Sequence, residues 1–267
     1  MIETQGISID AVVVAPGRGE SLFELAERAA AALPGADGAG GVIAATFSNP
    51  ERFPSLAVRV ASALSLGKDT PAFDIQLACS AYPYAVYLAG RLSADIGRPV
   101  LVVDGDVQSR LVDASDPATG AIFSDAATAS LVRASREGVS RFAFMSRCDT
   151  ALSCGESGPI RMDGFKVFSF VATEVTPFLR AFGSDYDLFV PHQANPYMVR
   201  QLAKGLGAED KLLAIDESAK NPGSCSVPFA LAAGGRTGKA LVAGFGAGYS
   251  AAAGTVRIAE GFRGKVL

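Results

Sequence analysis

The sequence of 267 residues uses one structural plan twice, and this repeat constrains the fold more than any single motif. In each half, apolar strand patterns alternate with helix patterns in the order β-α-β-α-β-α-β-β. Such alternation is typical of α/β folds with largely parallel sheets. We therefore expect two pseudo-equivalent halves that pack together, with the boundary near residue 135: an N-terminal half over residues 1–135 and a C-terminal half over residues 136–267.

The predicted elements follow from apolar periodicity and from turn residues. In the first half, the sequence predicts strands at residues 3–15, 41–47, 71–78, 99–107 and 121–134, and helices at residues 20–33, 54–66 and 79–96. In the second half, it predicts strands at residues 141–147, 187–191, 211–216, 239–245 and 250–258, and helices at residues 164–182, 195–206 and 222–233.

Composition excludes several classes of function. The 24 basic and 27 acidic residues give a net charge of −3 with no basic block, so we expect no nucleic-acid partner. No apolar run approaches the roughly 18 residues that a membrane-spanning helix needs, so we expect no membrane partner. The start of the chain has no signal-peptide pattern, and the four cysteines form no metal-type pair of pairs. The sequence thus predicts a cytoplasmic protein with reduced thiols and no metal.

Cys79 lies where the predicted strand at residues 71–78 gives way to a helix. The start of a helix offers unpaired backbone N–H groups and the positive end of the helix dipole, and both favour a thiolate over a thiol. Cys79 is therefore a candidate nucleophile. The alternative is that it is a small buried apolar residue, which is what a free cysteine most often is.

Two further residues follow strands of the second half. His192 is the single histidine of the chain, and Asn221 precedes Pro222 and Gly223. Taken alone, they are a surface or core histidine and a turn asparagine. If the halves pack as equivalents, however, both lie near Cys79 at the strand ends where open α/β sheets bind ligands. A thiolate, an imidazole and a carboxamide together suit acyl transfer, because the sulfur can attack a thioester and the other two can stabilise an enolate.

Four motifs in order give the chain a family resemblance. The first lies between residues 71 and 132 and contains the segments PAFDIQLACSAY, VLVVDGDVQSR and DPATGAIFSDAATASLV. The other three are VPHQAN (190–195), NPGSCSVP (221–228) and GFGAGY (244–249). Together they resemble β-ketoacyl-acyl-carrier-protein synthase III of the thiolase superfamily, over about residues 43–258. The resemblance implies a five-layered αβαβα thiolase fold, normally dimeric, in a protein that needs no cofactor beyond its thioester substrates.

The resemblance also implies a mechanism. Cys79 takes an acyl group from a coenzyme A or carrier-protein thioester, and a malonyl-type extender is then decarboxylated and attacks the acyl-cysteine. His192 and Asn221 stabilise the enolate, while the backbone N–H groups of Cys79 and Ala247 form the oxyanion hole.

Other positions are assigned by the same resemblance. Gly246 and Gly248 flank the oxyanion-hole loop and let its backbone approach the substrate, although a plain tight β-hairpin is the alternative for this loop. Phe53 matches a position that lines the acyl pocket, often across the dimer interface. Tyr82 matches a gate-like position three residues after the nucleophile.

The chain is shorter than an ordinary member of this family. The segment between Val14 and Ser21, which in the family carries residues that grip coenzyme A, is reduced to a turn, and residues 147–161 are compressed. We therefore expect an acyl carrier protein as partner, and either a homodimer or a heteromer with a related ketosynthase-like chain. Two other functions stay open, namely acyl transfer to an oxygen or nitrogen nucleophile, and a pocket-completing subunit of a heteromeric ketosynthase. The presence of Cys79, His192 and Asn221 favours the condensing enzyme over both.

Overall fold

The computed structural model describes residues 1–155 and 158–267. Apolar strands and amphipathic helices alternate along the first half, as the periodicity predicts. Its elements are β1 (Ile2–Pro16), α1 (Leu22–Ala31), β2 (Gly41–Ala45), α2 (Leu56–Ala63), β3 (Ala72–Ile75), α3 (Ala81–Ile96) and β4 (Val100–Asp106), followed by β5 (Ala126–Asp149).

The second half begins with a short hairpin and continues through helices and strands. Its elements are β6 (Leu152–Ser153), β7 (Arg161–Met162), α4 (Gly164–Phe170), α5 (Thr176–Arg180), β8 (Leu188–Pro191), α6 (Pro196–Leu206), α7 (Ser226–Gly234), β9 (Gly238–Gly246) and β10 (Gly248–Val266). A π-helical turn, Val171–Val175, joins α4 to α5, so the predicted helix at residues 164–182 is helical over most of its length.

The strands pair in the order β3-β2-β4-β5-β1-β10-β9-β8, with β5 also pairing β10. The pairs of β2 with β3, β2 with β4, and β8 with β9 are parallel. Long strands connect the two halves: the first part of β5 pairs with β4 and β1, and its last part pairs with β10. This pairing forms two sheet layers that share their long strands.

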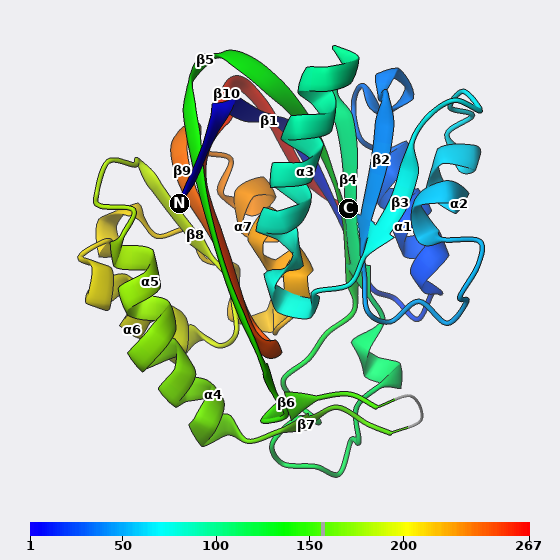
Figure 1. The fold of residues 1–267 in the computed structure, drawn as a ribbon. Coiled ribbons are helices and arrows are strands. Elements are labelled where there is room, and N and C mark those ends of the chain that lie inside the picture. The colour runs from blue at the N-terminus through cyan, green and yellow to red at the C-terminus, as the bar shows by residue number, and fades with distance from the viewer. Residues whose placement is uncertain (156–157) are drawn as a thin grey trace.

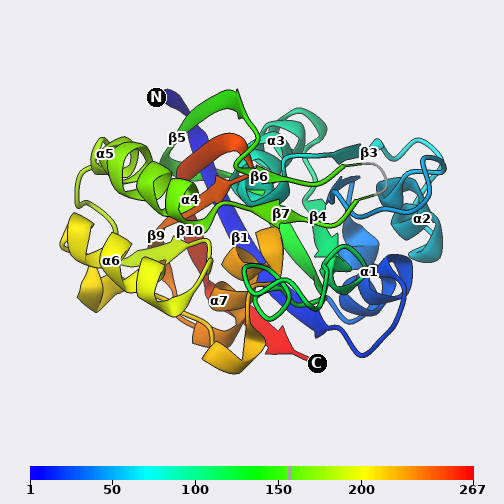
Figure 2. The ribbon, with the colours of Figure 1, turned by 90° about the horizontal axis from the view of Figure 1, so that it is seen from below.

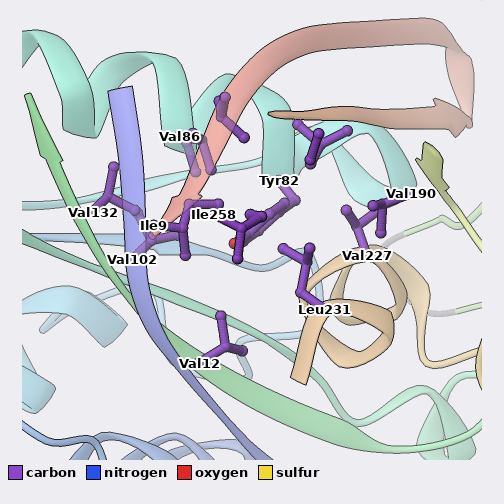
Figure 3. Packing of buried hydrophobic residues seen from close by; sticks show 14 of the residues in the cluster. Ile9, Val12, Tyr82, Val86, Val102, Val132, Val190, Val227, Leu231 and Ile258 are labelled. Carbon is purple, nitrogen blue, oxygen red and sulfur yellow. The ribbon is translucent and has the colours of Figure 1, made fainter. Parts of the chain in front are cut away.

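Three clusters of buried hydrophobic residues hold the five layers together. Helices α3 and α7 lie between the two sheet layers, where Tyr82 and Val86 of α3 meet Val227 and Leu231 of α7 (Figures 1 and 3). Helices α1 and α2 cover one outer face, and α4, α5 and α6 cover the other (Figure 2). The predicted αβαβα order is confirmed. Because α3 and α7 are enclosed by sheets, the turns that precede them lie in the interior.

Polar residues fix the helix starts near the site. Ser55 caps α2, and the Asp74 carboxylate accepts the N–H groups of Leu56 and Ala57 at 2.9 and 2.8 Å. Asn195 caps α6 by accepting the Met198 N–H at 2.8 Å. These contacts satisfy backbone donors that the first helical turn leaves unpaired.

Three predicted strands differ from the structure. Those expected at residues 121–134 and 141–147 do form strand, but as parts of one continuous strand, β5, which begins at Ala126. The strand expected at residues 211–216 does not form, because only Leu212 bridges to Phe189 and the Asp216 side chain then caps a short 3-10 turn. Within the described ranges, no helix has the length and apolarity needed to cross a membrane.

Candidate active site

Cys79 lies in a three-residue 3-10 turn, Ala78–Ser80, between β3 and α3. We call this the Cys79 turn. Ala78 has a φ of +43°, a left-handed conformation that non-glycine residues rarely adopt and that is found disproportionately at functional sites. Cys79 is 5% exposed. The sulfur therefore stands just ahead of α3, as the sequence predicts.

The tight turn between β9 and β10 packs against Cys79. A Cβ atom added to Gly246 would lie 3.0 Å from the Cys79 Cβ and 3.3 Å from its Sγ, and one added to Gly244 would lie 2.7 Å from the Cys79 carbonyl oxygen. Only glycine allows this approach. The loop is a tight β-hairpin, the alternative interpretation of its sequence, and it also adjoins the nucleophile.

Two opposing influences act on the Cys79 thiol. Burial, followed by the negative charge of Asp106, raises its pKa to about 12. The backbone N–H groups of Cys79 and Ala247 act in the opposite direction by hydrogen bonding to the sulfur. These are the two amides that the resemblance assigns to the oxyanion hole, and both reach the reacting atom.

His192 follows β8 and is 2% exposed. Its backbone N–H donates to the Ala243 carbonyl at 2.7 Å, and its ring packs edge-on against Phe245 with centroids 5.5 Å apart. Nδ1 lies 2.8 Å from the Ser226 Oγ. Burial lowers the pKa of His192 to about 4, and a hydrogen bond with the Gly223 backbone opposes this only in part. The imidazole is therefore neutral at physiological pH.

Asn221 is 5% exposed and is held by several backbone contacts. Its Oδ1 accepts the Gly223 N–H at 2.9 Å, and its Nδ2 donates to the Ala194 carbonyl at 3.3 Å. The Gln108 side chain donates to the Asn221 carbonyl at 3.1 Å. Since a carboxamide has two N–H groups, the contact with Ala194 leaves one for a substrate.

The three predicted residues meet at adjacent turns. The Cys79 turn packs against the turn Gly223–Cys225, which follows Asn221 and which we call the Gly223 turn. The Gly223 backbone also bonds to His192, while Phe245 and Gly246 contact His192 and Cys79, respectively. Residues far apart in the sequence are thus brought together through the packing of α3 and α7 between the sheets.

A cavity of about 910 Å³ leads to the sulfur. Cys79, Ala247, Gly248 and Tyr249 line it, with Arg110 among the residues that complete its wall. A second cavity, of about 250 Å³, is lined by Asn221, Gln193 and Ala194. The nucleophile and the carboxamide are therefore approached from two different hollows of the surface.

Two predicted substrate contacts do not line the large cavity. Phe53 is 84% exposed, in the loop between β2 and α2, and does not line the large cavity. Tyr82 is fully buried in the core between the sheets, where Figure 3 shows it among aliphatic side chains, and its hydroxyl lies 3.0 Å from the Ser130 Oγ. Its side chain points away from the cavity because the inner face of α3 is packed against the strands.

The sequence analysis missed two buried carboxyl groups on β4. Asp104 and Asp106 are both fully buried, and a negative charge on either one would raise the pKa of Cys79. Burial raises the pKa of Asp106 to about 6 and that of Asp104 well above its usual value. Two acidic residues in the otherwise apolar strand Val100–Asp106 were the signal for them, because acidic residues are seldom buried without a partner. In the described part of the chain, no cluster of three or more His, Cys, Asp or Glu side chains has the arrangement of a metal site.

Comparison with known proteins decides the family. Residues 73–149 match the family described as 3-Oxoacyl-[acyl-carrier-protein (ACP)] synthase III, and residues 182–258 match its C-terminal part. The chain belongs to this synthase III family. It is 30% identical to the β-ketoacyl-[acyl-carrier-protein] synthase III of Neisseria gonorrhoeae over 236 residues, which cover 78% of this chain and 74% of the relative.

Solved structures share the fold of this chain. The 3-oxoacyl-(acyl-carrier protein) synthase of Burkholderia xenovorans superposes with a TM-score of 0.87 at 22% identity, covering 99% of this chain and 98% of that one. The priming β-ketosynthase of a polyketide biosynthetic pathway superposes with a TM-score of 0.82 at 25% identity, covering 91% and 83%. The predicted thiolase-like fold is confirmed, as is the enzyme class: a condensing acyltransferase of fatty-acid or polyketide-type biosynthesis.

Proposed function

We propose that this synthase III transfers an acyl group from a carrier-bound thioester to Cys79 and then condenses it with a malonyl-type thioester. The observation that carries the proposal is the position of the Cys79 sulfur. It lies within reach of the backbone N–H groups of Cys79 and Ala247 and next to the turn that holds both His192 and Asn221.

In the first half-reaction, the Cys79 sulfur attacks the thioester carbonyl. The N–H groups of Cys79 and Ala247 stabilise the oxyanion that forms. A sulfur–carbon bond to Cys79 forms, the bond to the donor sulfur breaks, and the donor leaves as a thiol with the proton that Cys79 gives up. Because the thiol has a pKa of about 12, this proton leaves as the attack occurs and the thiolate is scarcely populated beforehand.

In the second half-reaction, the malonyl carbon–carboxylate bond breaks and carbon dioxide leaves. The electron pair becomes an enolate, which accepts hydrogen bonds from the His192 ring and the Asn221 carboxamide. The enolate carbon then attacks the acyl carbon, a carbon–carbon bond forms, the bond between the acyl carbon and the Cys79 sulfur breaks, and the released sulfur takes up a proton from water. A neutral imidazole suits this step, because burying an imidazolium would cost the free energy of removing its charge from water.

The acyl donor needs a carrier that brings its thioester into the large cavity. The turn between β1 and α1 is short, and Arg110 borders the large cavity near Leu22, the first residue of α1. An arginine suits the phosphate of a phosphopantetheine arm. We infer an acyl carrier protein as the donor's carrier. The 84% exposure of Phe53 supports a homodimer or a heteromer with a related chain, in which this ring enters the partner's cavity.

Intact-mass measurement tests the first half-reaction. Purified protein is incubated with acyl groups on coenzyme A and on carrier protein, and the Cys79→Ala variant is the control. We expect a mass increase equal to the acyl group, faster with the carrier, and none in the variant. Acylation at equal rates from both donors would contradict the carrier proposal.

Measuring the release of carbon dioxide distinguishes condensation from the alternative functions. A condensing enzyme releases carbon dioxide from a malonyl thioester and forms a 3-oxoacyl product, whereas transfer to an oxygen or nitrogen nucleophile does neither. A pocket-completing subunit would keep its effect on a partner after Cys79→Ala. Sedimentation of the purified protein, alone and mixed with a related chain, distinguishes the homodimer from the heteromer.

A further inference from the structure

Asp104 is a buried carboxyl group attached to the Gly223 turn. Its Oδ1 accepts a hydrogen bond from the Ser224 hydroxyl, and the Cys225 thiol lies 3.8 Å from the same oxygen. The Cys225 Sγ also lies 3.0 Å from the Asp104 carbonyl oxygen and 3.4 Å from that of Ala126. Asp104, Ser224 and Cys225 are all at most 1% exposed. A single residue of β4 therefore fixes two of the three residues of this turn.

The Gly223 turn bonds to both groups that are assigned to stabilise the enolate, the Asn221 carboxamide and the His192 imidazole. The Gly223 N–H donates to the Asn221 Oδ1 at 2.9 Å, and the Gly223 backbone bonds to the His192 imidazole. Gly223 has a φ of +66° and faces the Gln108 side chain, so the turn has little freedom to change shape. A shift of the turn would move the carboxamide and the imidazole together.

The contacts of Asp104 favour a neutral carboxyl group. Its Oδ2 is buried, and no residue in the described ranges bonds to it. An ionised carboxylate would leave this oxygen unpaired in a dry interior, close to the second buried carboxyl group, Asp106. Burial accordingly raises the pKa of Asp104 well above its usual value. A neutral carboxamide of the same shape should therefore replace it with little change.

We propose that Asp104 is a positioning residue for the decarboxylation half-reaction, acting through Ser224 and the Gly223 turn on His192 and Asn221. This inference rests on the proposed function. It predicts a selective effect, because the Cys79 and Ala247 amides that serve the acylation step belong to other turns, whereas the Asp104 side chain bonds to Ser224 and Cys225 among the described residues.

The test measures the two half-reactions separately in the full-length protein. Asp104→Ala should slow the release of carbon dioxide from a malonyl thioester at least tenfold while leaving the rate of Cys79 acylation within twofold. Asp104→Asn should keep both rates within about threefold of wild type, because its carbonyl oxygen can still accept from Ser224. Rescue by the isosteric variant is not expected if the carboxyl group acts through a negative charge.

A second pair of variants decides the question if Asp104→Ala does not fold. Ser224→Ala removes the donor to Oδ1 and should slow decarboxylation several-fold. Ser140→Ala is the matched control: Ser140 is also a buried serine, 3% exposed, but its hydroxyl accepts the Ile7 N–H at 2.9 Å, away from this turn. It should change neither half-reaction.

The outcomes separate this inference from the proposed function. If the wild-type protein neither acylates Cys79 nor releases carbon dioxide, the proposed function fails. If the wild type does both, and Asp104→Ala and Ser224→Ala slow both steps equally or neither, only the positioning role of Asp104 is overturned.

Discussion

Replacing Gly246 by alanine should disable the acylation step. The added Cβ would lie 3.0 Å from the Cys79 Cβ and 3.3 Å from its sulfur, whereas carbon atoms pack best at about 3.5–4.0 Å. Gly246 also has a φ of +155°, which an alanine adopts only with strain. To relieve the contact, the sulfur has to move relative to the Ala247 N–H.

The expected magnitude follows from these two costs. Overpacking of a well-packed site costs about 1–3 kcal/mol, and a residue held in an unfavourable backbone conformation costs a further 1–3 kcal/mol or so. If about 2.7 kcal/mol of this appears in the barrier to acylation, the rate falls about 100-fold. The remainder should lower the melting temperature.

The assay follows the mass of the protein after rapid mixing with an acyl thioester. Gly261→Ala is the control, because a Cβ added to Gly261 meets nothing within 4 Å and this residue has no positive φ. The control should match wild type in rate and melting temperature. A folded Gly246→Ala protein that acylates within threefold of wild type would refute the close approach of this loop to the sulfur.

Two further predictions concern His192 and Tyr82. The pKa of His192 is about 4 in the folded protein against 6.5 ordinarily, so its contribution to stability is complete above pH 6.5 and is lost as the pH falls towards 4. Urea denaturation should therefore show wild type losing about 2–3 kcal/mol relative to His192→Gln between pH 7.5 and pH 4.5. Asp106, whose pKa is raised to about 6, acts with the opposite sign, and the difference between the two proteins cancels its effect. An unchanged difference would show that the imidazole is not buried neutral. Tyr82→Phe removes the hydrogen bond to Ser130 and should lower the free energy of unfolding by about 1 kcal/mol without changing the acyl chain-length preference. A changed preference would instead support the gate role that the sequence suggested.

Sequence patterns predicted the elements whose signals are local. The helix expected at residues 54–66 forms as α2, and the position of Cys79 between a strand and a helix follows from a change of apolar period. Both depend on residues within a few positions of each other. The boundaries of β5 and the loss of the strand at residues 211–216 depend on pairing with distant strands, which periodicity does not report.

The proposed catalytic set was suggested by motifs, and the turns that carry it are brought together by tertiary structure. The sequence by itself determined that a thiol and an imidazole follow strand ends and that an asparagine precedes a Pro-Gly turn, since residue type and local period depend on neighbouring residues alone. Only the enclosure of α3 and α7 between two sheets decided that the Cys79 and Gly223 turns touch. The same packing turned Tyr82 into the core. It also placed the Asp104 carboxyl group where it accepts a hydrogen bond from Ser224, 120 residues away, because burial and long-range contacts depend on how complete layers stack.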